Sequence, residues 1–404
     1  MFIIICIGFG VLSVVSYQST HSINISFVNS VIWTFLSVMV VIMGLPKSLQ
    51  SFLFVFFNTL VFTICYLLLL SSSRVSIKNI NENNTDSPIN LELFNKINKV
   101  VAFLGIAGLI YLAFSLGFRL STFTSINSLM VKMNAISHMR YSEDGDYLPV
   151  VNRLINTMSY AACGYAGFSS VIKQKKEYVY NLIILALQTV LTNTKATIVF
   201  AIAFYLGGLL TGYSFFKKRL RAKSLIAAAL LLIVIICFAT FIDYFRHAGQ
   251  IDLLTEYKKI MSSYFVGPYS AFSIWFENSP KDSFDLGSNT FSSVFRILGI
   301  TPQVHGEFVN INGTQTNVYT VFKHLINDYS MPGTIIVSAL MGYISAITDV
   351  YISCRKKNAI GFSIVIIATI SICFFSSIFR YTINVLACII IILYGLIQSK
   401  KKEN

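Results

Sequence analysis

The chain changes from polar to apolar at residues 327–352, which read NDYSMPGTIIVSALMGYISAITDVYI. The second part of this stretch, residues 334–352, is long enough and apolar enough to cross a membrane as one helix. The polar part closes the longest run of recurrent polar residues in the sequence, 243–333. A membrane protein that keeps its largest polar segment on one face is expected to carry out its chemistry or its recognition there.

Apolar runs of this kind recur along the whole chain. Only 12% of the residues are charged, about half of the roughly 25% that soluble domains carry. We predict eleven spans, at residues 2–16, 27–45, 52–70, 100–118, 154–172, 178–191, 196–215, 225–242, 334–352, 360–378 and 383–397. The fold class expected is therefore an all-α, polytopic integral membrane protein, with a single transmembrane domain over residues 1–404.

Basic clusters fix the expected orientation. They lie at residues 173–176, 217–223, 355–357 and 400–402, each at the end of a predicted span. Two spans separate each cluster from the next, so all four share one face, which the positive-inside rule makes cytoplasmic. The segments 119–153 and 243–333 then form external loops, the larger one before the ninth span. Because the positive charge sits at span ends, it does not indicate nucleic-acid binding.

Metal and disulfide chemistry have little support. None of the seven cysteines lies in an external loop, and no Cys/His spacing typical of a metal site occurs. Asp144 and Asp146 form a DxD tripeptide, which also describes an ordinary turn. We expect no metal and no cofactor.

The large external loop contains two segments with helical character. Residues 252–276 place apolar side chains three and four apart, which predicts an interfacial helix that Gly267 and Pro268 break. A short helix is expected over 318–325, capped by Asn317 or Thr316. Asn312-Gly313 matches a glycosylation sequon with Thr314 but is read more simply as a turn.

Arginine and lysine on the external face need a reason, because short external loops disfavour them. Arg380 lies in a tight turn at a predicted membrane boundary, Arg153 just precedes the fifth span, and Lys195 lies between the sixth and seventh. A guanidinium binds phosphate oxygens bidentately and keeps its charge. We therefore predict an anion site; the alternative is contact with lipid headgroups by snorkelling side chains.

A general base could come from the end of the same loop. His324 and Asp328 lie four residues apart, one helical turn, shortly before the ninth span. Either could accept a proton from a hydroxyl if its environment matches it to the operating pH. The alternative for Asp328 is a cap on the helix that begins near residues 330–334.

The end of the loop resembles the oligosaccharide repeat-unit polymerases, the Wzy-type O-antigen polymerase family. The resemblance is carried by residues 316–322 (TNVYTVF), 327–333 (NDYSMPG) and 264–268 (YFVGP), and by the layout of about eleven spans with one dominant loop near the carboxyl end. It departs at Lys195, where the family usually carries arginine. A point-charge contact is expected there instead of a bidentate clamp.

The resemblance implies a metal-independent membrane glycosyltransferase of the helical GT-C-like type, in the bacterial inner membrane with its active face periplasmic. A growing glycan on undecaprenyl diphosphate would be transferred to the non-reducing end of an undecaprenyl-diphosphate-linked repeat unit. Membrane lipids and a chain-length regulator would be further partners. The implied catalytic residues are Asp328, His324 and Arg380. The substrate-binding residues expected are Arg153, Lys195, Arg246, Arg296, Arg140, Asn317 and Tyr319.

Two other functions stay open. An O-antigen ligase would use the same donor with a different acceptor. A flippase or other transporter of lipid-linked oligosaccharides is expected to place ionisable groups at the middle of the bilayer. The predicted spans hold almost none, and Asp349 lies near a cytoplasmic end. This favours chemistry on one face.

Overall fold

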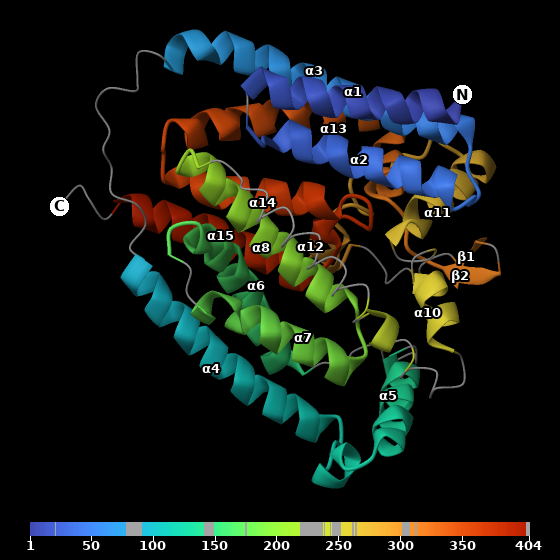
Figure 1. Ribbon diagram of the computed structural model, residues 1–404, viewed down its shortest axis with the longest axis vertical. Helices are drawn as coiled ribbons and strands as arrows, with labels where there is room; N and C mark the ends of the chain where they lie inside the picture. Colours follow the sequence, from blue (N-terminus) through green and yellow to red (C-terminus); the bar gives the residue numbers. More distant parts are fainter. Residues whose placement is uncertain are drawn as a thin grey trace. The chain divides into compact units, whose positions relative to one another are not determined.

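The computed structural model describes residues 1–404 except 21, 78–90, 141–148, 174–175, 219–236, 238, 243, 245–251, 261, 263–264, 301–307, 312 and 401–404. The described residues are mostly helical, and a two-stranded hairpin is the one sheet among them (Figure 1). The all-α prediction is confirmed.

Six described helices are long and apolar enough to cross a membrane. They are α1 (Phe2–Thr20), α2 (Ile25–Ile42), α3 (Leu49–Ile77), α4 (Leu91–Ser115), α8 (Ala196–Phe215) and α13 (Val321–Ser353). A helix suits these segments because it satisfies every backbone hydrogen bond within itself, as lipid requires. The protein is therefore embedded in a membrane.

The count of eleven spans stays a prediction. α14 (Asn358–Ile372) and α15 (Thr382–Lys400) are apolar but shorter than the six long spans. α6 (Val150–Ser170) and α7 (Tyr180–Thr192) form at two further predicted spans without meeting the length and hydropathy of a crossing helix. The predicted span at 225–242 lies almost wholly outside the described residues.

The chain divides into two compact units. The first comprises Met1–Ile89, Leu210–Arg219 and Ser262–Asn404, and the second comprises Asn90–Leu209 and Leu220–Met261.

The first unit brings both ends of the chain together. α13, orange in Figure 1, packs along α3, and α1 packs on α2. At Gly342 of α13 a β-carbon would lie 2.3 Å from the carbonyl oxygen of Phe62, so these two backbones touch. Towards one end, Trp33, Phe322 and Tyr269 form an aromatic core with their neighbours. Burial of such large side chains is a major source of stability.

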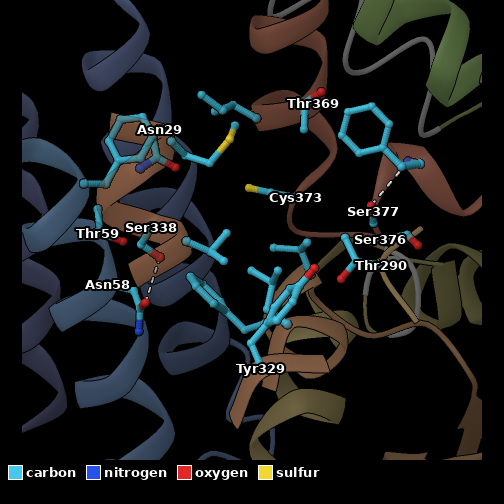
Figure 2. Close-up of a pocket in the computed structure, with 18 of the residues that line it drawn as sticks. Asn29, Asn58, Thr59, Thr290, Tyr329, Ser338, Thr369, Cys373, Ser376 and Ser377 are labelled. Carbon is cyan, nitrogen blue, oxygen red and sulfur yellow. Dashed lines mark hydrogen bonds between the residues drawn. The ribbon is translucent and has the colours of Figure 1, made fainter. Parts of the chain in front are cut away.

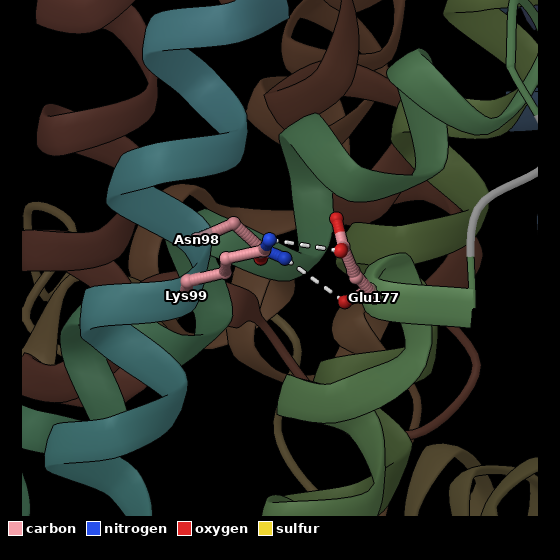
Figure 3. A network of polar contacts seen from close by, with 3 residues as sticks. All are labelled: Asn98, Lys99 and Glu177. Carbon is pink, nitrogen blue, oxygen red and sulfur yellow. Dashed lines mark hydrogen bonds and ion pairs between the residues drawn. The ribbon is translucent and has the colours of Figure 1, made fainter.

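The second unit packs α4, α6, α7 and α8 together with α5 (Ile126–Arg140). α6 and α8 approach closely, since a β-carbon on Gly208 would lie 1.7 Å from the carbonyl oxygen of Gly164. The end of α4 is tied to residues 176–179, where Asn98 donates to the carbonyl oxygen of Glu177 at 2.9 Å and Lys99 pairs with its carboxylate at 2.9 Å (Figure 3).

The long polar segment, residues 243–333, is more structured than its sequence suggested. It forms α10 (Leu253–Ile260), α11 (Gly267–Asn278), α12 (Ser292–Ile297), β1 (Val309–Ile311) and β2 (Thr314–Thr316). The predicted break in the helical run 252–276 is confirmed, because α10 ends at Ile260 and a new helix, α11, starts at Gly267. Pro268 suits the first turn of α11, where its missing N–H is not needed. Ile311 pairs with Thr314, and Gly313 lies in a turn between the two strands. Asn312, the first residue of the predicted Asn-Gly turn, lies outside the described residues.

Candidate functional site at the start of α13

The start of α13 is joined to the end of α14. Thr320 takes the N-cap position, so the predicted cap at Asn317 or Thr316 is wrong. The N–H of Val321 donates to the carbonyl oxygen of Cys373 at 2.8 Å. Just beyond Cys373, the chain turns through the short helix η4 (Ile378–Arg380), which Ser377 caps by accepting from the N–H of Phe379. The first turn of α13 and the η4 turn therefore lie together.

This arrangement brings His324 into contact with Arg380. The two side chains meet with 2.9 Å between Nη1 of Arg380 and Nε2 of His324. A guanidinium can only donate hydrogen bonds, so Nε2 is the acceptor and the imidazole is neutral, with its proton on Nδ1. Two of the three predicted catalytic residues are thus placed together, although 56 positions separate them in the sequence.

Among the described residues, no carboxylate forms an ion pair with Arg380. Within the described residues, ion pairs occur at Lys96–Glu92 and Lys99–Glu177, both in the second unit. Arg380 is partly buried, and its described polar side-chain partner is the uncharged ring of His324. A partly desolvated guanidinium without a counter-charge favours binding of an anion.

Lys323 adds a second cation to the same helical turn. Its side chain is buried, and Nζ lies 3.6 Å from the ring centre of Tyr319 and 5.7 Å from that of Trp275. Aromatic ring faces attract such a cation. Tyr319, predicted to bind substrate, is itself buried by this contact, whereas Asn317 is exposed.

α13 is kinked next to this turn, and the kink frees backbone acceptors. Ser330 has φ 59° and ψ −179°, outside the helical range. Pro332 has no N–H to give to the carbonyl oxygen of Asp328, four residues earlier. That carbonyl accepts the N–H of Leu286 at 3.2 Å instead, and the carbonyl of Asn327 accepts the N–H of Asp285 at 3.1 Å.

The carboxylate of Asp328 binds the same segment, at residues 289–290. It is fully buried and accepts from the backbone N–H groups of Asn289 at 2.8 Å and Thr290 at 2.7 Å, and from Nδ2 of Asn289 at 2.9 Å. The alternative of a cap on its own helix is therefore replaced by a cross-link to another segment. In this arrangement the carboxylate holds residues 285–290 in place against α13.

The anchored loop leads directly to Arg380. α12 follows residues 285–290, and the hydroxyl of Ser293 donates to the carbonyl oxygen of Phe379 at 2.7 Å. Phe291 and Phe379 also pack ring to ring, with centroids 5.4 Å apart. Asp328 thus supports the η4 turn through α12, and the η4 turn presents Arg380 to His324.

A cavity of about 260 Å³ lies within the first unit (Figure 2). His324 and Arg380 do not line it, but their sequence neighbours Leu325 and Phe379 do. Its walls come from α2, α3, α13, the end of α14 and the loop at Thr290. Most of the lining is apolar. Two hydroxyl groups on its wall, Oγ1 of Thr290 and Oγ of Ser376, are buried and have no hydrogen-bond partner among the described residues. Buried polar atoms normally have a hydrogen-bond partner, so these two hydroxyl groups can bind a ligand or water.

The predicted site residues fall in both units. Asp328, His324, Arg380, Arg296, Asn317 and Tyr319 belong to the first unit, and Arg153, Lys195 and Arg140 belong to the second. Arg296 is exposed in the last turn of α12, Arg153 is partly buried, and Lys195 is buried. Arg246 and the Asp144–Asp146 tripeptide lie outside the described residues, as does the side chain of Arg140. A pool of cations shared by the two units stays a prediction.

Several residues of the site were not predicted from the sequence. Thr290 and Ser376 are ordinary polar residues in the sequence, and Ser293 matters only through its contact with Phe379. Pro332 was a usable signal, because a proline four residues after Asp328 leaves that carbonyl oxygen without its helical donor.

These features define a helical membrane protein with an arginine–histidine pair and an apolar cavity at the start of α13. The chain matches no protein-family model, no curated protein and no solved structure.

Proposed function

We propose that this protein is a membrane glycosyltransferase that polymerises lipid-linked oligosaccharide repeat units, of the O-antigen polymerase type. The donor would be a glycan on undecaprenyl diphosphate, and the acceptor would be one repeat unit on the same lipid, at the periplasmic face of the bacterial inner membrane. The observation that carries the proposal is the contact of 2.9 Å between Arg380 and a neutral His324. The sequence resemblance at residues 316–333 supports the choice of reaction.

The pair supplies the two chemical functions that this transfer needs. The acceptor hydroxyl attacks the anomeric carbon of the donor, a new glycosidic bond forms, and the bond to the diphosphate oxygen breaks. Arg380 stabilises the negative charge that collects on the departing diphosphate, since preorganised charge stabilisation is commonly the largest catalytic contribution. Nε2 of His324 accepts the proton of the hydroxyl.

The contact between the two residues gives an order to these events. In the structure, the lone pair of His324 Nε2 is occupied by the guanidinium of Arg380. A diphosphate bound to Arg380 would compete for that donor, because charge-assisted hydrogen bonds are stronger than those to a neutral ring. Nε2 of His324 is then released to act as a base only when the glycan on undecaprenyl diphosphate is bound at Arg380.

Replacing Arg380 with alanine tests the proposal. In a strain that depends on this protein for its surface polysaccharide, the Arg380→Ala variant should insert in the membrane at normal levels and leave only single repeat units on lipid A-core. Arg119→Ala is the matched control, because Arg119 is exposed in the second unit, and it should keep the full polymer ladder. Gel analysis of lipopolysaccharide reads out both.

Deletion of the protein separates polymerase from the alternatives. A single-repeat product supports the polymerase. Polymer that accumulates on its carrier lipid without reaching lipid A would indicate a ligase, and loss of every periplasmic repeat unit would indicate a transporter. Normal polymer in the Arg380→Ala strain would remove Arg380 from the site.

A further inference from the structure

The cavity beside the arginine–histidine pair has an apolar interior. Phe62, Val337, Met341, Ile370 and Cys373 are among its lining residues. They come from α3, α13, α14 and the residue that ends α14, and α3 and α13 are two of the helices long enough to cross a membrane. Its volume of about 260 Å³ lies just below the roughly 300–1,000 Å³ of small-molecule pockets. It can therefore enclose a short piece of an apolar chain.

Polar groups gather on one part of the wall. Thr290 and Ser376 are 5% and 3% exposed, and neither hydroxyl has a hydrogen-bond partner in the part of the chain that the structure describes. Figure 2 shows their side chains close together, with Ser377 beside them. A buried hydroxyl without a partner costs free energy that a bound oxygen atom would recover.

The same part of the wall adjoins the cation. Ser377 and Phe379 line the cavity and immediately precede Arg380 in the η4 turn. Thr290 is fixed in place by its N–H bond to Asp328. The cavity therefore combines an apolar interior with two hydroxyl groups that lack a partner among the described residues. Its lining ends at Phe379, the residue before Arg380, whose charge is not paired with a described carboxylate. A ligand that matches them has an apolar chain attached directly to a phosphate.

We propose that this cavity binds the chain segment next to the phosphate of a prenyl-phosphate lipid, with Thr290 and Ser376 donating to oxygen atoms of its head. The inference rests on the proposed function for the choice of a prenyl chain. It assigns to the first unit the subsite that selects the carrier lipid, a role separate from recognition of the sugars. The chain enters between membrane helices, and the phosphate stays at Arg380.

A binding experiment with matched tryptophan variants tests this subsite. Val337 lines the cavity, whereas its neighbour Ile336 is 61% exposed on α13. In purified full-length protein, Val337→Trp should raise the dissociation constant for undecaprenyl phosphate at least tenfold, while Ile336→Trp should leave it unchanged. Thr290→Val and Ser376→Ala, which remove a hydroxyl without filling the cavity, should each raise it severalfold. Thermal unfolding in the same detergent verifies that every variant is folded.

Competing ligands identify what the subsite recognises. Inorganic phosphate should not compete at millimolar concentration, and phosphatidic acid should compete at least tenfold more weakly than undecaprenyl phosphate. Equal competition by phosphatidic acid would overturn the assignment to prenyl chains, and equal competition by inorganic phosphate would overturn the role of the cavity.

Failure of the subsite and failure of the proposed function give different results. If the wild type binds undecaprenyl phosphate and Val337→Trp binds it equally well, the subsite is refuted while the polymerase proposal stands. If the wild type does not bind the lipid and its deletion leaves polymer intact, the proposed function itself is refuted. A photoreactive prenyl phosphate should also label the lining residues Val337 and Met341 and the segment 369–376, and it should not label Leu340, which is exposed.

Discussion

The tautomer and the neutral charge state of His324 follow from its contact with Arg380 and from the nearby Lys323. Arg380 donates to Nε2 of His324, which keeps the ring in one tautomer. Lys323 on the adjacent position is held by the rings of Tyr319 and Trp275. Two fixed cations next to the ring disfavour a third positive charge, so a neutral His324 suits the role of proton acceptor.

His324→Gln should abolish most of the transfer activity while keeping the contact with Arg380. The glutamine amide oxygen can still accept from the guanidinium, but an amide cannot take up a proton. We expect the polymerisation rate on lipid-linked repeat units to fall about a hundredfold or more, the usual range for loss of a general base. His138→Gln, at an exposed position on α5, is the control. A variant that polymerises at the wild-type rate would show that His324 only positions Arg380.

Asp328→Asn should lower stability through the external loop. The carboxylate accepts three hydrogen bonds from Asn289 and Thr290, and an amide has only one acceptor oxygen. At least one buried N–H then loses its partner, at a cost of about 1–3 kcal/mol. Thermal unfolding in detergent and proteolysis within residues 282–291 measure the effect, and Asp282→Asn, at an exposed position, is the control. Wild-type unfolding and proteolysis would contradict the proposed anchor.

At the scale of elements, the kink in α13 organises the site. Pro332 leaves the carbonyl oxygen of Asp328 without a helical donor, and the N–H of Leu286 takes its place. The first part of α13 then binds residues 285–290 at its side, while the part after the kink continues along α3. In a straight helix without proline, the carbonyl oxygen of Asp328 would accept a hydrogen bond from its own helix and could not bind Leu286.

Ser330→Gly should stabilise the protein. The φ of 59° and ψ of −179° at this position belong to a region that glycine adopts readily and that costs other residues about 1–3 kcal/mol. Ser330→Ala keeps the β-carbon and its strain, so it is the matched control. The unfolding temperature in detergent should rise for glycine relative to alanine. An equal or lower temperature for glycine would show that the kink stores no strain.

At the scale of the whole molecule, the chain is made of two units that each contain membrane helices. The first unit holds the arginine–histidine pair and the cavity, and the second holds Arg153 and Lys195. The lining of the cavity comes from segments as distant as residues 29 and 379. The site of the first unit therefore depends on helices contributed by both ends of the chain.

The predicted orientation can be measured with engineered cysteines. In a protein with its seven native cysteines replaced, His138→Cys should react with a membrane-impermeant maleimide in intact spheroplasts, because residues 119–153 are predicted to lie outside. Lys356→Cys, in a predicted cytoplasmic cluster, should react only after the membrane is permeabilised. Labelling of both positions in intact spheroplasts would contradict the odd number of predicted crossings between them. The reverse pattern would contradict the predicted orientation.

Much of the fold could be predicted because its signals are local. A run such as 334–352 is apolar throughout, and a helix is the structure that satisfies its backbone in lipid. Weaker runs such as 154–172 formed helices whose hydropathy does not mark them as spans. The short helix expected over 318–325 is instead the first part of α13, which begins at Val321 and continues through the predicted span. Its cap was misplaced because Thr316 belongs to the hairpin.

The sequence alone determined that the chain is helical and embedded in a membrane, and it singled out His324, Asp328 and Arg380, because hydropathy, charge and residue type act over a few residues. Only the tertiary structure decided that Arg380 reaches His324, that Asp328 holds residues 289–290, and that a cavity with two vacant hydroxyl groups lies beside them. Such contacts depend on how separate helices pack and where their ends meet, and no spacing along a single chain specifies that.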